Sequence, residues 1–166
     1  MVFSSIVFLV YFLPIFFTIY YLVPRRLKNP VILAGSILFY AWGGPKFIFV
    51  ILGTTIFDFY IVRWMYYSES AKRRKLLLIA SLTLNVGLLF YFKYANFFID
   101  NINLALTASG VNPVSWLNVV LPIGISFYTF ETITYVVDVY RKVHKPLDKF
   151  WDYQLYIIFF SKLIAG

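Results

Sequence analysis

Long apolar stretches without charged side chains dominate this sequence and restrict the folds that the chain can adopt. The first stretch, Met1 to Val23, carries no Asp, Glu, Lys or Arg. About 20 apolar residues in a helix cross the hydrocarbon core of a bilayer. The chain is 61% hydrophobic and 13% charged, whereas soluble domains average about 25% charged residues. The sequence therefore predicts an all-α, multi-pass transmembrane helical bundle, because helices satisfy their own backbone hydrogen bonds in lipid.

The apolar stretches predict a single membrane domain over residues 1–166 with about five transmembrane spans. The expected spans are residues 3–23, 31–44, 47–62, 76–92 and 119–139. Between the last two spans, apolar and polar residues recur at helical spacing, which predicts an interfacial helix near 95–106 in the headgroup plane. A sixth apolar segment starts at 153 and is still apolar at 166. We expect from this that the chain is the N-terminal fragment of a longer protein.

The basic residues orient this predicted bundle. The net charge is +8, from 15 Lys and Arg against 7 Asp and Glu. With the N-terminus outside, the connections after the first, third and fifth spans share one side, and basic loops stay in the cytoplasm. We therefore expect cytoplasmic basic loops and the lipid bilayer as partner, with no nucleic-acid binding. These connections hold 12 of the 15 cations: Arg25, Arg26, Lys28, Arg63, Lys72, Arg73, Arg74, Lys75, Arg141, Lys142, Lys145 and Lys149.

The predicted fifth span carries a line of polar side chains that recur every three or four residues, a spacing that places them on one side of a helix. They are Tyr128, Glu131, Thr134, Tyr135 and Asp138. A carboxylate at mid-depth costs a few kcal/mol if it faces lipid, so Glu131 must face protein or a water-filled cavity. We interpret the five residues as candidates for lining a polar passage for substrate or protons. The alternative is a structural carboxylate bonded to a neighbouring helix.

Two carboxylates near the ends of predicted spans have structural interpretations. Asp138 lies close to the third basic loop, and we expect it to pair with Arg141 or Lys142. Asp58 lies near the end of its span, and we expect it to form an interfacial ion pair with Arg63. Both predictions place a negative charge beside a cation near the membrane surface.

The sequence contains no recognisable catalytic constellation. Cysteine is absent, and the sole histidine, His144, lies in a basic loop where a surface position is expected. The serines Ser4, Ser5 and Ser126 have no base nearby to activate them. No group of side chains has the spacing of metal ligands. We therefore expect no catalytic residue, no metal site and no bound cofactor in this chain.

Several motifs resemble those of the membrane-bound O-acyltransferase family, and they occur in order along the whole chain. They are Met1–Ser5, Phe39–Trp42, Tyr91–Phe97, Leu121–Glu131 with Tyr135, Asp138–Arg141, and Phe159–Gly166. The stretch in the predicted fifth span is the most specific of these motifs. The last motif stops just after it begins, so the resemblance is to an N-terminal portion with an incomplete core of the family's fold.

This resemblance implies an O-acyltransferase, specifically an acetyltransferase, in the inner membrane of a bacterium. It would move an acetyl group from a cytoplasmic donor, acetyl-CoA, towards an extracytoplasmic polysaccharide such as alginate, with soluble or periplasmic O-acetylation proteins as partners. The family's catalytic histidine lies beyond the matching part, so the fragment alone is expected to be inactive. Two other classes stay open: a transporter or channel, and a non-catalytic membrane subunit. Transporters often contain inverted repeats, which are not evident in this sequence.

Overall fold

The computed structural model describes residues 5–43, 45–122 and 124–165, and this part of the chain is helical with no strand. The elements in order are the π-helical turn η1 (Phe8–Phe12), α1 (Leu13–Leu22), the 3-10 turn η2 (Arg25–Leu27), α2 (Lys28–Gly43), α3 (Pro45–Tyr67), α4 (Ala71–Ala108), α5 (Ile125–Tyr140), α6 (Phe150–Ile158) and α7 (Phe160–Ala165). The prediction of an all-α fold is confirmed.

Two helices in the described part, α3 and α4, are long and apolar enough to cross a membrane. The 23 residues of α3 extend over about 34 Å at a rise of about 1.5 Å per residue. This length slightly exceeds the hydrocarbon core of a bilayer, which is about 30 Å thick. The assignment of five spans to particular residue ranges stays a prediction.

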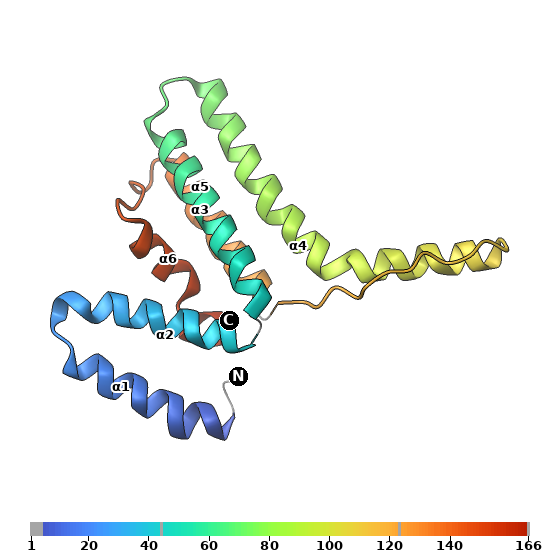
Figure 1. The fold of residues 1–166 in the computed structure, drawn as a ribbon. Helices are drawn as coiled ribbons and strands as arrows, with labels where there is room; N and C mark the ends of the chain where they lie inside the picture. The colour runs from blue at the N-terminus through green and yellow to red at the C-terminus, as the bar shows by residue number, and fades with distance from the viewer. Residues whose placement is uncertain (1–4, 44, 123, 166) are drawn as a thin grey trace.

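The helices form two groups joined by α6. Figure 1 shows α3, the first part of α4 and α5 side by side, and α1 and α2 as a pair at one end of the molecule. α6 packs against α2, α3 and α5. The main core consists of apolar side chains from these elements, including Ile51 on α3, Ile125 on α5 and Ile157 on α6. The C-terminal helices therefore hold the N-terminal pair against the rest of the bundle.

α4 differs from the expected pattern, because one helix covers both the predicted span 76–92 and the predicted interfacial helix 95–106. The residues between these ranges include neither Gly nor Pro, so nothing in the sequence ends the helix there. Figure 1 shows that α4 changes direction where its colour passes from green to yellow, and its second part projects away from the other helices. We call this second part and the returning chain the arm (residues 94–122).

Two asparagine side chains hold the returning chain of the arm against α4. Asn96 Oδ1 accepts a hydrogen bond from the Val119 N–H at 2.9 Å, and Asn96 Nδ2 donates to the Val119 carbonyl at 2.8 Å. Asn103 binds Val114 in the same way, at 2.7 Å and 3.1 Å. Each amide satisfies both backbone polar groups of one extended residue, as a neighbouring strand would.

The predicted span 119–139 is helical only from Ile125 onward. Pro122 lacks the backbone N–H that a preceding turn would use. Gly124 has a φ of +76°, a conformation that glycine adopts at little cost and that a side chain would strain. These two residues separate the extended chain from the helix, so residues 119–122 belong to the arm and α5 has 16 residues.

Two helices cover the predicted sixth apolar segment, 153–166, as far as residue 165, where the described part of the chain ends. α6 begins at Phe150, and at Phe159 the chain leaves the helical conformation with a ψ of 115°. The Phe160 N–H donates to Ser36 Oγ on α2 at 3.3 Å. A side chain of α2 thus satisfies a backbone group at the break, as buried backbone donors require.

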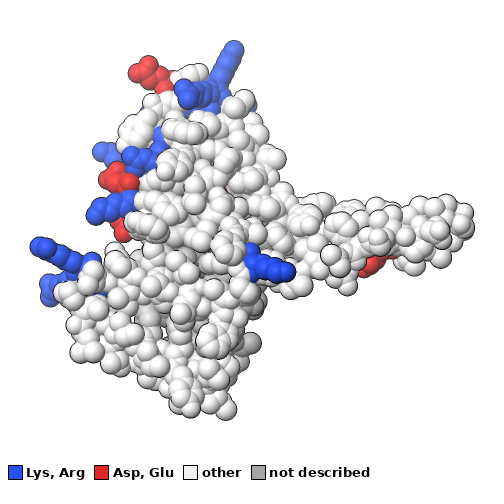
Figure 2. Space-filling view, in the orientation of Figure 1, with Lys and Arg blue, Asp and Glu red and all other residues white. Residues whose placement is uncertain are grey.

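Positive charge gathers along one edge of the molecule. Figure 2 shows Lys and Arg over the α1–α2 and α3–α4 connections and at further positions along the same edge, while the arm shows little charge. Between residues 94 and 122 the sequence has one charged side chain, Asp100. Charge is therefore concentrated away from the arm.

Candidate functional site

An ion pair between a largely buried carboxylate and a partly exposed lysine joins α5 to α7. Lys162 Nζ lies 2.6 Å from Glu131 Oε1 and 4.5 Å from the centre of the Tyr156 ring. The Glu131 side chain is 10% exposed and the Lys162 side chain 42% exposed. Glu131 therefore lies against protein and a cation, as the cost of a carboxylate facing lipid requires.

The second oxygen of this carboxylate has an unused hydrogen-bonding position. Glu131 Oε2 is buried and has no hydrogen-bond partner within the described residues. Leaving a buried polar atom without a partner costs about 1–3 kcal/mol. A hollow of about 230 Å³ lies at the Lys162 side of the ion pair and is lined by Lys162, Tyr156 and apolar side chains, but not by Glu131. A hydroxyl group, an amide N–H or a water molecule would supply the missing donor.

The polar line on α5 covers an arc rather than a narrow stripe. At about 100° per residue, the five predicted residues extend over about 120° around the helix axis. Tyr128, at one side of the arc, is buried in the main core. Thr134, at the other side, is exposed and donates to the Phe130 carbonyl at 2.9 Å. Glu131, Tyr135 and Asp138 lie between them and are partly buried.

Tyr135 connects the middle of this arc to the loop after α5. Its hydroxyl oxygen accepts a hydrogen bond from the Leu147 N–H at 2.9 Å. Its ring centre lies 5.0 Å from that of Tyr153 and 5.8 Å from that of Tyr156. Tyr156 in turn contacts Lys162, so aromatic rings link Tyr135 to the ion pair.

The predicted ion pair between Asp58 and Arg63 is wrong. Asp58 is fully buried and accepts hydrogen bonds from Ser81 Oγ and, at 2.8 Å, from Asn85 Nδ2. Arg63 instead donates to the Asp148 carbonyl at 2.9 Å. Residues five apart on a helix point about 140° away from each other, so α3 directs Asp58 inward and Arg63 towards the loop after α5.

Asp138 also lacks the predicted cation partner. Within the described ranges it forms no ion pair with Arg141 or Lys142. Lys142 adopts a φ of 60°, so the chain turns sharply after α5 and the Val143 N–H donates to the Asp138 carbonyl at 2.9 Å. His144 follows this turn and is exposed, as predicted for a surface residue.

Buried polar contacts involve Asp58 and also Thr55, and neither contact was among the sequence-based predictions. On α3, Thr55 Oγ1 lies 2.6 Å from Gln154 Oε1 of α6, and Gln154 is fully buried. Ser81 and Asn85 are four residues apart in an apolar stretch, a spacing that could have signalled an inward-facing pair. Across residues 5–43, 45–122 and 124–165, no group of three or more His, Cys, Asp or Glu side chains is close enough to hold a metal ion.

Known proteins resemble the chain in sequence, whereas neither a known family model nor a solved structure matches it. The probable alginate O-acetylase AlgI of Pseudomonas syringae pv. tomato is 41% identical over 167 residues, covering 100% of this chain and 32% of the relative. AlgI of Pseudomonas aeruginosa is 40% identical with the same coverage. The peptidoglycan O-acetyltransferase of Helicobacter pylori is 29% identical over 195 residues, covering 100% of this chain and 36% of the relative. The chain spans about a third of the length of these curated relatives.

Proposed function

The chain is homologous over its whole length to alginate O-acetylases of the membrane-bound O-acyltransferase family, and we propose that it forms part of an enzyme that acetylates a polysaccharide. The acetyl group comes from a cytoplasmic donor, acetyl-CoA, and is delivered to an extracytoplasmic polysaccharide such as alginate. Soluble or periplasmic O-acetylation proteins act as partners. The homology to a probable alginate O-acetylase and to a peptidoglycan O-acetyltransferase supports this substrate class.

The buried, unpaired carboxylate oxygen of Glu131 is the observation that carries the site. Glu131, Tyr135 and Asp138 lie in the middle of the polar arc, with Tyr128 and Thr134 at its sides, and we assign these five residues to the wall of the passage for the acetyl group. Lys162 balances the charge of Glu131 at 2.6 Å, which lets a carboxylate persist inside a membrane protein. The free Oε2 is the acceptor for a hydroxyl or amide of the passing substrate.

The acyl-transfer histidine is assigned to the part of the relatives that this chain does not cover. The sole histidine of these 166 residues, His144, is exposed in the loop after α5. Within the described residues it forms no ion pair that would orient an acid–base group. Residues 1–166 therefore supply part of the passage, and by themselves they do not catalyse acetyl transfer.

The orientation in the bacterial inner membrane follows from the charges. The N-terminus is outside and the basic connections are cytoplasmic, with spans near residues 3–23, 31–44, 47–62, 76–92 and 119–139. The concentration of Lys and Arg along one edge (Figure 2) supports this orientation. The arm then lies on the opposite side, where its exposed apolar side chains, such as Leu117 and Phe97, suit the headgroup boundary.

Acetyl transfer by the full-length protein tests this function. Glu131→Ala and Glu131→Gln are compared with the unmodified protein for acetyl-CoA-dependent O-acetylation of the polysaccharide. We expect at least a tenfold loss for Glu131→Ala and a smaller loss for Glu131→Gln, which keeps one acceptor oxygen. Asp100→Asn, a change of an exposed carboxylate on the arm, serves as the control and should leave activity unchanged. Full activity of Glu131→Ala would refute the role of Glu131 in the passage. The absence of acetyl transfer by the unmodified protein would refute the proposed acetyltransferase activity.

A further inference from the structure

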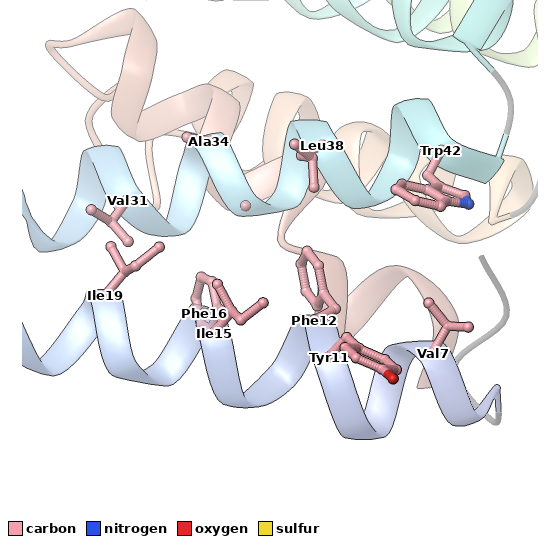
Figure 3. Close-up of a pocket in the computed structure, with 11 residues that line it drawn as sticks. Val7, Tyr11, Phe12, Ile15, Phe16, Ile19, Val31, Ala34, Leu38 and Trp42 are labelled. Atoms are coloured by element: carbon pink, nitrogen blue, oxygen red, sulfur yellow. The ribbon is translucent and has the colours of Figure 1, made fainter.

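An apolar groove of about 450 Å³ runs between η1–α1 and α2. Figure 3 shows side chains from both helices directed towards this groove, with Val7, Tyr11 and Trp42 at one end and Ile19 and Val31 at the other. The wall between the two ends includes Phe12, Phe16, Ala34 and Leu38, and none of the described residues that line it is charged. Grooves of this volume are in the range that holds an organic ligand.

Aromatic packing and a glycine shape the groove. The Phe12 and Phe16 rings stack with their centres 6.0 Å apart, and Phe160 packs against both, at 5.8 Å and 5.2 Å. A Cβ atom on Gly35 would come within 2.8 Å of the Phe16 ring. Gly35 therefore permits α1 and α2 to approach closely along one side, while the bulky rings keep a slot open along the other.

The end of the groove at Ile19 and Val31 is next to the basic α1–α2 connection. Arg25 and Arg26 are exposed there, and Lys28 Nζ lies 4.6 Å above the centre of the Tyr20 ring. None of these three cations forms a salt bridge within the described residues. The connection therefore presents three cations without a salt bridge at one end of an apolar slot.

From this combination we infer that the groove binds an acyl chain of an anionic phospholipid whose headgroup rests on Arg25, Arg26 and Lys28. The uncharged wall matches a hydrocarbon chain, which needs no hydrogen-bond partner. The cations select a negatively charged headgroup, because basic residues beside a membrane attract anionic lipids. From Val7 to Ile19 the helix rises by about 18 Å, a length suited to a lipid chain lying along the helices.

Photo-crosslinking of the full-length protein in phosphatidylethanolamine vesicles tests this inference. One arm contains phosphatidylglycerol with a diazirine near the end of one acyl chain, and the other contains phosphatidylcholine with the same chain. Mass spectrometry locates the crosslinks. We expect phosphatidylglycerol to label residues 7–19 and 31–42 at least fivefold more than phosphatidylcholine does. Equal labelling by both lipids, or no labelling of the groove because protein covers it, would overturn the inference.

Three variants separate the two halves of the site. The double change Arg25→Gln and Arg26→Gln should lower labelling by phosphatidylglycerol to the level of phosphatidylcholine, while labelling by phosphatidylcholine stays the same. Ala34→Phe fills the groove and should lower groove labelling by both lipids at least fivefold. Ala105→Phe, an equal enlargement at an exposed position on the arm, should change neither. The inference is also contradicted if labelling stays undiminished in the double variant of Arg25 and Arg26 and in the Ala34→Phe variant.

Discussion

Asn85 on α4 donates a hydrogen bond of 2.8 Å to the Asp58 carboxylate on α3, and both side chains are buried. Ser81 donates to the other carboxylate oxygen. These contacts join the two helices that are long and apolar enough to cross a membrane. The α3–α4 interface is therefore held by polar bonds as well as by apolar packing, which is how polar side chains stabilise helices within a bilayer.

Replacing Asp58 should weaken this interface. Asp58→Ala removes the acceptor of two buried donors, so we expect the free energy of unfolding to fall by about 2 kcal/mol or more. Unfolding of the full-length protein in mixed micelles with increasing dodecyl sulfate measures this. A double-mutant cycle of Asp58→Ala with Asn85→Ala should give a coupling energy of about 0.6–2 kcal/mol. The matched cycle with Arg63→Gln should give less than about 0.5 kcal/mol, and a larger coupling to Arg63 would contradict the structure.

Removing Lys162 should leave Glu131 as a buried charge without a partner. We expect Lys162→Met to lower the free energy of unfolding by about 1–3 kcal/mol, a value below that of a fully buried pair because Lys162 is partly exposed. Adding Glu131→Gln to Lys162→Met should restore part of the loss, since the unpaired charge is gone. Lys46→Met, at an exposed lysine, should change stability by less than about 0.5 kcal/mol. Purely additive effects of the Glu131 and Lys162 changes would show that the pair does not form.

The asparagine contacts of the arm predict local hydrogen-exchange protection. Asn96→Ala removes the acceptor of the Val119 N–H, so exchange at Val119 should accelerate by about 5- to 30-fold, equivalent to about 1–2 kcal/mol. Asn96→Asp keeps an acceptor oxygen and should have a smaller effect. Asn103→Ala should accelerate exchange at Val114 and leave Val119 nearly unchanged. Exchange measured by mass spectrometry with peptide-level resolution distinguishes these patterns, and equal acceleration at both valines would show that the arm opens as one unit.

The proposed orientation predicts which loops react from outside the cell. The chain contains no cysteine, so a single cysteine can be introduced into it. The experiment uses a full-length protein from which any other cysteines have been removed. Asn112→Cys, in the arm, should react with a membrane-impermeant maleimide on intact cells. Lys72→Cys, in the basic α3–α4 connection, should react only after the inner membrane is permeabilised. The reverse result would overturn the assignment of the basic loops to the cytoplasm.

The all-α membrane architecture could be predicted from the sequence because uncharged stretches of this length leave a chain few alternatives. The resemblance to membrane-bound O-acyltransferases is likewise confirmed by the homology to alginate O-acetylases. The course of the chain from residue 93 to 124 could not be predicted in the same way. A moderate rise in polarity does not end a helix, so α4 continues to Ala108. Gly124, whose backbone conformation sets the start of α5, lies within an apolar stretch, so the averaged hydropathy does not mark this boundary.

The sequence analysis identified Glu131 but not its partner. Lys162 is 31 residues away and follows a helix break at Phe159 that neither proline nor glycine marks, so no local pattern connects the two. The prediction for Asp58 fails for a different reason: Arg63 is near Asp58 in the sequence but points in another direction from the helix. Helical periodicity alone argues against a contact between residues five apart. Partners four apart on the next helix, Ser81 and Asn85, fit the geometry instead.

The hydrogen bonds between Asn96 and Val119 hold the two ends of the arm together, so they determine where the chain can change in length. Beyond this contact, residues 97–118 leave the bundle and return to it at Val119, so both ends of the excursion are anchored at one place. Insertions or deletions between these ends change how far the arm reaches without shifting the first part of α4 or the start of α5. The entropic cost of closing a loop rises slowly with its length. Residues 97–118 can therefore vary in number while the buried polar contacts between the helices stay in place.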